Sequence, residues 1–348
     1  IEHAIQNIIN LYMLYLRFVR LFISYLAFIV LCVAVYNYEL SMYLLRQAKG
    51  QLYVLSGTQS FEAFKANNTL TEKESINLGL IDQIKKFSVD SLAYKPTNNF
   101  TSIYDQQNKP ILWVITASEK YQLKAVEWKF PLIGSVSYKG FFNKELALKE
   151  KNNLRANGFD VGIRSVSAWS TLGWFNDPLL SSHLNKSKGN FCNLLFHELF
   201  HATFYEANRI NDNENLANFI AHKATQQFLK NDTLALNEYM YDYFEREKLN
   251  KFLHSNTKTH ELFLNSISTH KNKLILKQKQ LIFLIKKLKN EGINKQKLIF
   301  ITEEEILIEQ NAYFIDYMQY SSQQDSLENA FNKFYKGSIK NMVRSLAP

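Results

Sequence analysis

Cysteine, glycine and proline are all scarce in this sequence. Among 348 residues there are 2 cysteines, 11 glycines and 5 prolines. The two cysteines, Cys32 and Cys192, lie far apart in the chain and in different surroundings, so we expect no disulfide. A structural zinc site built from cysteines is excluded because it needs several clustered thiols. The chain also lacks an internal repeat, a low-complexity run and a phosphate-binding glycine loop.

Positive charge is in excess but dispersed. The sequence has 41 Lys and Arg against 32 Asp and Glu, a formal net charge of +9. Lysines are densest from Lys271 to Lys297, and include Lys273, Lys277 and Lys279. We interpret this region as the solvated face of a long helix, with docking to an anionic membrane or to nucleic acid as the alternative. We expect no nucleic-acid partner.

An uncharged apolar run occupies residues 21–38 near the start of the sequence. Its length is about the minimum for a membrane-spanning helix. Arg17 and Arg20 precede the run and Glu39 follows it, which places the N-terminus in the cytoplasm and the rest outside. We therefore predict a single-pass membrane protein whose main part faces the extracytoplasmic (periplasmic) side. A signal peptide cleaved, for example, after Ala34 is the alternative.

Hydrophobic periodicity predicts an α+β fold that is mostly helical. Helices are expected over residues 39–53, 71–87, 146–157 and 262–289, and two more after residue 311, broken near Gly337. Strands are expected over residues 110–116, 134–140 and 161–169. We divide the chain into an N-terminal tail and anchor (1–38), a helical region (39–105), a core (106–235) and a C-terminal helical region (236–348).

The segment His197-Glu198-Leu-Phe-His201 has the spacing of a metal site on a helix. Side chains four residues apart lie about 5–6 Å apart at Cβ on one helix face, so His197 and His201 can hold one ion together. Zinc prefers such imidazole nitrogens, and a fourth position beside three protein ligands is left for water. Glu198 lies beside that position and is the candidate general base.

Glu214 is the candidate third ligand. It follows His201 by thirteen residues, and Asp212 resembles an N-cap, which would place Glu214 in the first turn of a second helix. The alternative is a chance pattern in which both histidines are ordinary core residues. However, the helix around the motif is strongly apolar, and burying two imidazoles and a carboxylate without partners would cost several kcal/mol. We therefore predict a site for one zinc ion.

Three blocks of the sequence together resemble the putative bacterial aminopeptidase family of zincin-like metalloproteins. They are residues 166–180 (Val-Ser-Ala-Trp-Ser-Thr-Leu-Gly-Trp-Phe-Asn-Asp-Pro-Leu-Leu), 196–201 and 213–219. The similarity covers roughly residues 40–230. It implies a zincin-like core in a membrane-linked or exported zinc peptidase that acts on peptides. His197, His201 and Glu214 would be the ligands and Glu198 the base.

The sequence departs from the family pattern at a few positions. Lys129 and Ser135 stand where members commonly have cysteines, so the corresponding disulfide is not expected. Trp169 replaces a usual tyrosine, and Ala221 replaces a common acidic residue. The donor that would stabilise the negative charge on the reacting carbonyl oxygen is therefore left open among four residues: Tyr138, Arg164, His183 and Tyr205.

Two further interpretations stay open. Residues Ser165 to Trp169 could form an edge strand that aligns an extended peptide by main-chain pairing, or an ordinary edge strand. At the level of function, the alternative to a peptidase is a non-catalytic binding or scaffold protein of the cell envelope that keeps a zincin fold. The sequence does not indicate an oligomeric state.

Overall fold

The computed structural model describes residues 2–130, 134–166, 176–206, 209–267, 269–291, 303–318 and 324–346. The chain forms two compact units, residues 1–56 and 57–348. The first unit consists of α1 (Glu2–Tyr36) and α2 (Tyr38–Ser56), and α2 confirms the predicted helix over 39–53. The predicted membrane-spanning helix is not confirmed. Among the described residues, no helix combines the length and the apolar character needed to cross a membrane.

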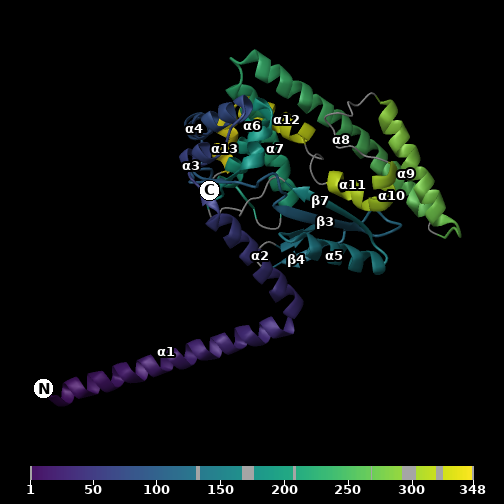
Figure 1. Cartoon of the computed structure of the whole chain (residues 1–348). Helices are drawn as coiled ribbons and strands as arrows, with labels where there is room; N and C mark the ends of the chain where they lie inside the picture. Colours follow the sequence, from purple (N-terminus) through teal and green to yellow (C-terminus); the bar gives the residue numbers. More distant parts are fainter. Residues whose placement is uncertain are drawn as a thin grey trace. The chain divides into compact units, whose positions relative to one another are not determined.

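The second unit is mostly helical with small sheets, which confirms the predicted α+β class (Figure 1). Its helices are α3 (Phe61–Asn67), α4 (Glu72–Leu92), α5 (Lys144–Ala156), η1 (Ser181–Asn185, a 3-10 helix), α6 (Lys188–His201), α7 (Ile210–Phe228), α8 (Thr233–Ile267), α9 (Lys273–Asn290), α10 (Glu303–Glu309), α11 (Asn311–Met318), α12 (Gln324–Tyr335) and α13 (Ile339–Leu346). Its strands are β1 (Thr58–Gln59), β2 (Ile103–Tyr104), β3 (Leu112–Ser118), β4 (Trp128–Phe130), β5 (Gly134–Val136), β6 (Tyr138–Phe141), β7 (Asp160–Val166) and β8 (Leu179–Leu180).

Among the described residues, the strands of this unit form three small sheets. Strand β3 lies between β6 and β7 and is antiparallel to both. The other two sheets have the orders β1-β2-β8 and β4-β5. The single strand predicted over 134–140 was wrong, because β5 pairs with β4 whereas β6 pairs with β3. The chain changes its pairing strand between Val136 and Tyr138, so residues 134–140 are divided between two sheets.

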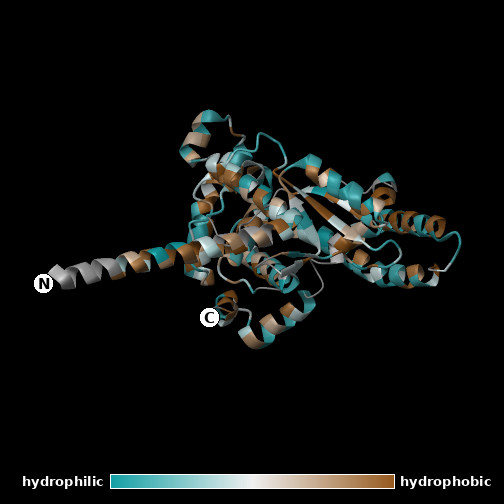
Figure 2. Ribbon diagram, turned by 90° about the horizontal axis from the view of Figure 1, so that it is seen from below, coloured by the Kyte–Doolittle hydropathy of each residue, from teal (hydrophilic) through white to brown (hydrophobic). Residues whose placement is uncertain are grey.

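The main hydrophobic core lies among α4, α6, α7, α12 and α13. Phe196 of α6 makes edge-to-face ring contacts with Phe87 of α4 and Phe228 of α7. A capping box begins α4: Glu74 N donates to Thr71 Oγ1 at 3.3 Å, and Thr71 N donates to Glu74 Oε2 at 2.8 Å. Helices of this unit alternate hydrophobic and hydrophilic residues along their length (Figure 2), as expected where one side faces a core. The core also includes C-terminal residues: Phe331, Ile339, Met342 and Val343.

A second core joins α8, α9, α10 and α11. Its buried residues are Leu249, Phe252, Leu253, Leu281, Leu284, Ile285, Ile306, Tyr313 and Phe314. The single helix predicted over 262–289 was wrong: α8 ends at Ile267 and α9 begins at Lys273. His270 N donates to Ile267 O at 2.9 Å in the turn between them. The turn lets two amphipathic helices pack against each other. The predicted break near Gly337 is confirmed between α12 and α13.

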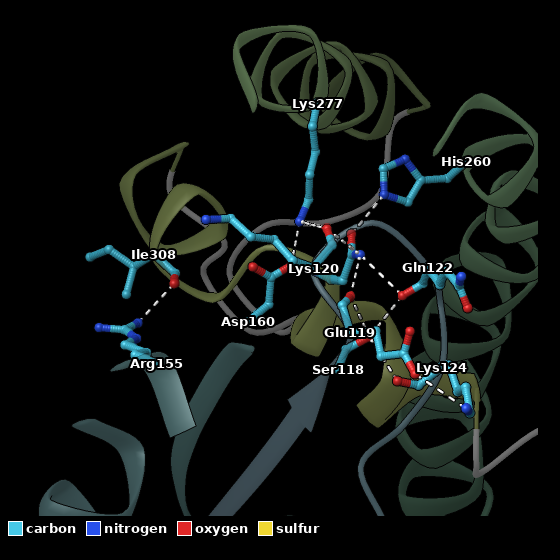
Figure 3. Close-up of polar contacts among 11 residues, drawn as sticks. Ser118, Glu119, Lys120, Gln122, Lys124, Arg155, Asp160, His260, Lys277 and Ile308 are labelled. Atoms are coloured by element: carbon cyan, nitrogen blue, oxygen red, sulfur yellow. Dashed lines mark hydrogen bonds and ion pairs between the residues drawn. The ribbon is translucent and has the colours of Figure 1, made fainter. Parts of the chain in front are cut away.

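A buried polar network fixes α9 and α11 to the start of β7 (Figure 3). Lys277 of α9 forms an ion pair with Asp160 of β7 and donates to Lys120 O at 2.6 Å. Asn311 N donates to Asp160 Oδ2 at 3.2 Å, and His260 Nε2 lies 3.1 Å from Asn311 Oδ1. Lys277 is 0% exposed, so its assignment to a solvated helix face was wrong. Other lysines of that region are exposed as predicted, among them Lys271, Lys279 and Lys286.

Candidate metal centre

Helix α6 carries the predicted motif and is held firmly at its start. The 3-10 helix η1 leads into it, and Asn77 Nδ2 of α4 donates to Leu184 O and Lys186 O, both at 2.9 Å. Near the start of α6, Gly189 packs against Tyr239 of α8. A Cβ at position 189 would lie 2.4 Å from Tyr239 Cβ, so only glycine allows this approach. The apolar face of α6 is buried as predicted, including Phe191, Leu195, Phe196, Leu199 and Phe200.

Helix α7 presents Glu214 toward α6. It begins at Ile210, so the prediction that Asp212 caps it was wrong; Asp212 lies in the first turn and accepts from Arg209 Nε at 2.8 Å. Glu214 is consequently in the second turn. The neighbouring Asn213 is buried and fixes the loop between the helices. Its Nδ2 donates to Glu206 O at 2.7 Å, and its Oδ1 accepts from Glu206 N at 3.0 Å.

The three predicted ligands converge. His197 Nε2 lies 3.0 Å from His201 Nε2, and Glu214 Oε2 and Oε1 lie 3.3 Å from the Nε2 atoms of His197 and His201, respectively. A tetrahedral zinc ion with bonds of about 2.0–2.2 Å separates its donor atoms by about 3.4 Å. The separations in the cluster are close to that value. His197, His201 and Glu214 therefore fit a single small divalent cation.

The charges of these groups favour a cation at the same point. Burial lowers the pKa of His197, but its hydrogen bonds to Glu214 and Asn218 and the charges of Glu214 and Glu198 outweigh that effect and raise the pKa. Burial raises the pKa of Glu214, yet its bonds to His197 and His201 bring that pKa well below its usual range. The carboxylate thus stays charged and places negative charge beside the two imidazole nitrogens.

Glu198 lies beside the cluster and differs from Glu214 in its electrostatics. Burial raises its pKa above the usual range, and the charges of Glu214 and Asp177 act in the same direction, against those of His197 and His201. Asp177 is buried just before β8, where its backbone O accepts from Phe100 N at 2.8 Å. The site therefore contains one strongly ionised carboxylate and a second one that takes up a proton more readily.

The comparison with protein families shows to which family the chain belongs. A family model described as Putative aminopeptidase matches residues 42–346. The chain belongs to this family. The family suggests a peptidase activity. The match also includes the helices after residue 230, whereas the resemblance seen in the sequence covers roughly residues 40–230. Searches of curated proteins and of solved structures found no match.

The four candidates for the oxyanion donor are placed on different elements. Tyr205 lies in the loop after α6, and its pKa is raised by burial and by the charge of Glu214, which puts its phenol near the cluster. His183 is buried in η1, Tyr138 lies in β6 and Arg164 lies in β7.

The proposed substrate-aligning strand is described only in part. Ser165 lies in β7, an edge strand of its sheet, opposite Trp113 of β3. Residues 167–175, which include Trp169, lie outside the described residues. The outer edge of β7 is occupied at Ile163, whose N donates to Glu309 Oε1 of α10 at 3.3 Å. The edge position is confirmed for Ser165 and Val166, and peptide alignment stays a prediction.

Sequence reasoning missed two residues at the site, Asn218 and Asp177. Asn218 follows Glu214 by four residues, which puts both on one face of α7, and this spacing could have identified it. Asp177 comes from the segment before β8, and no local pattern indicates that it lies near Glu198.

Proposed function

We propose that the protein is a zinc-dependent peptidase of aminopeptidase type. One zinc ion would be held by His197, His201 and Glu214 in a zincin-like arrangement, with Glu198 as the general base. The observation that supports this proposal most strongly is the convergence of three ligand side chains, with donor atoms 3.0–3.3 Å apart, in a member of an aminopeptidase family. Two imidazoles and one carboxylate are also a ligand set that catalytic zinc sites use.

The side chains around the cluster would divide the work of hydrolysis. When bound, zinc acts as a Lewis acid toward the peptide carbonyl and toward water. Glu198 would take a proton from the attacking water and pass it to the leaving amine. Its raised pKa suits that exchange, since a base works best when its pKa approaches the working pH.

Two neighbours would assist. Asn218, by its hydrogen bond to His197, would hold that imidazole in the orientation needed for ligation. Tyr205 would donate to the carbonyl oxygen as negative charge develops on it. It is the favoured one of the four candidates because of its position near Glu214.

The test combines metal analysis with peptide cleavage by the full chain. We expect one zinc per chain in the wild-type protein and in Glu198→Gln, and loss of zinc in His201→Ala. Peptide cleavage, followed by mass spectrometry of a mixed peptide library, should fall by about 10²–10⁴-fold in Glu198→Gln.

The matched pair separates metal binding from proton transfer, because only one of the two variants removes a ligand. Equal cleavage by Glu198→Gln and the wild-type protein would exclude Glu198 as the base. A wild-type protein that binds no zinc would refute the proposal as a whole. Stoichiometric zinc without cleavage of any peptide would favour a non-catalytic binding protein.

A further inference from the structure

A polar cavity lies next to the candidate metal centre, between α6, α7, α8 and the start of α12. Its volume is about 290 Å³. It is lined by Asn193, Asn218, His222, Tyr239, Tyr243, Arg246, Glu247, Asn250 and Gln324. Since a water molecule occupies about 30 Å³ of liquid, the cavity holds about ten waters, or one amino-acid side chain. It is small compared with pockets for larger organic ligands.

The cavity adjoins the metal ligands on two helices. Asn193 precedes His197 by one turn of α6, and Asn218 follows Glu214 by one turn of α7. Asn218 both lines the cavity and forms a hydrogen bond with His197. A peptide bound with its reacting bond at the metal centre would therefore have a neighbouring residue within reach of the cavity.

Uncharged groups form the wall nearest the metal centre. Tyr239 OH accepts from Asn193 Nδ2 at 3.0 Å and lies 2.9 Å from His222 Nδ1. Burial, followed by the charges of Lys223 and Arg246, lowers the pKa of His222 to about 3, so its imidazole is neutral at physiological pH. The Tyr243 ring stacks on His222 with centroids 3.6 Å apart. Charge recognition in the cavity is thus left to the residues of α8.

Glu247 supplies negative charge at the α8 side. Its carboxylate accepts from the neutral Asn250 Nδ2 at 3.2 Å, and the described residues give it no ion pair. Burial raises the pKa of Tyr243 to about 12, and the charges of Glu247, Glu328 and Asp325 act in the same direction, against that of Arg246. Arg246, by contrast, is exposed and donates from Nη1 to Asn190 Oδ1 at 3.1 Å.

We infer that this cavity binds an alkylammonium group of the peptide substrate, with Glu247 as its anionic partner and the tyrosine rings as its apolar wall. A carboxylate and aromatic rings are the groups that proteins use to hold an ammonium ion. The inference rests on the proposed function in that it takes the bound molecule to be a peptide. The ammonium group can come from two sources, the amino terminus of the peptide or a lysine side chain.

The experiment measures binding rather than turnover. The zinc-loaded full chain carrying Glu198→Gln is titrated calorimetrically with alanine pentapeptide amides that contain one lysine, or one norleucine, at each position in turn. Each peptide is used with a free and with an acetylated amino end. We expect the ammonium-bearing member of a pair to bind about 10-fold or more tightly than its uncharged counterpart. A lysine effect identifies the side chain as the source, and an acetylation effect identifies the amino terminus.

Added substitutions on α8 test the role of Glu247. Glu247→Gln should abolish the preference, so that the affinity ratio of the ammonium-bearing and uncharged peptides falls to about 1. Glu238 is an exposed carboxylate on the same helix, and Glu238→Gln should retain the preference. Glu247→Arg should create a preference for pentapeptides containing glutamate, a gain that misfolding cannot produce. The inference is overturned by a preference that survives Glu247→Gln, by no preference at all, or by a preference for carboxylates that Arg246→Gln removes.

Cleavage by the wild-type chain is measured in parallel, so that the two proposals can fail separately. If the wild-type chain cleaves peptides but the cation preference is unchanged by Glu247→Gln, only the cavity assignment is refuted. Absence of cleavage together with a Glu247-dependent preference refutes the peptidase and supports the binding site.

Discussion

Lys277 and Asp160 are 117 residues apart in sequence and form a buried ion pair that joins α9 to β7. Their side chains are 0% and 4% exposed, respectively. Burial lowers the pKa of Lys277 and raises that of Asp160, so each charge depends on the other and on nearby hydrogen bonds. Asn311 completes the junction, since its Nδ2 donates to Glu119 O at 3.0 Å. The C-terminal helices are thereby fastened to the sheet.

Removing one member of this pair should destabilise the protein strongly. Lys277→Met leaves the Asp160 carboxylate buried without its cation, which lowers the free energy of unfolding by about 3–5 kcal/mol. Urea unfolding followed by circular dichroism measures the loss. Lys279→Met, an exposed lysine on the same helix, serves as the control and should change stability by less than about 0.5 kcal/mol. Similar losses in the two variants would contradict the structural role of the pair.

His260 should make stability fall in mild acid. Burial lowers its pKa from 6.5 to about 4, against its hydrogen bond with Asn311. The unfolded chain therefore binds the proton first, and the stability present above pH 6.5 is lost as the pH falls toward 4. From pH 7.5 to pH 5 this single group accounts for about 2 kcal/mol. Urea unfolding of His260→Gln at both pH values should show a smaller decrease by that amount, and an unchanged decrease would exclude His260.

Asn218 should affect metal affinity without being a ligand. Asn218→Leu removes the hydrogen bond that orients His197, and loss of such a partner weakens zinc binding by about 10–100-fold. Competition with a fluorescent chelator gives the dissociation constant. Asn211→Leu, an exposed position on the same helix, should bind zinc as the wild-type protein does. An unaltered constant in Asn218→Leu would show that His197 is oriented by other contacts.

Two glycines in helices should respond in opposite ways to alanine. Gly189→Ala forces α6 away from Tyr239 and should cost about 1–3 kcal/mol. Gly79→Ala in α4 meets no atom within 4 Å and should stabilise the protein by about 0.5–1 kcal/mol. Thermal unfolding of both variants tests the contrast. A stabilised Gly189→Ala would mean that α6 and α8 can separate at little cost.

Local sequence patterns were sufficient to predict part of the fold and the two histidines of the candidate site. The capping box at Thr71 and the four-residue spacing of His197 and His201 depend on contacts within one helix, so the sequence displays them directly. Lys277 was misread because its partner Asp160 comes from a distant strand. The division of residues 134–140 between β5 and β6 also depends on pairing partners, which no local pattern identifies. Asp177 likewise comes near Glu198 only in the folded chain, because the two residues belong to separate elements.

The core around α6 has a consequence for synthesis on the ribosome. Phe196 and Phe200 share that core with Ile339, Met342 and Val343 of α13, and α13 also lies against α4, where Lys340 Nζ donates to Asp90 O at 3.0 Å. Helices α6 and α7, which carry the candidate ligands, are therefore synthesised more than a hundred residues before α13, which completes their packing. Until α13 has left the exit tunnel, α6 and α7 have an incomplete core, and in a nascent chain the candidate metal centre should form late.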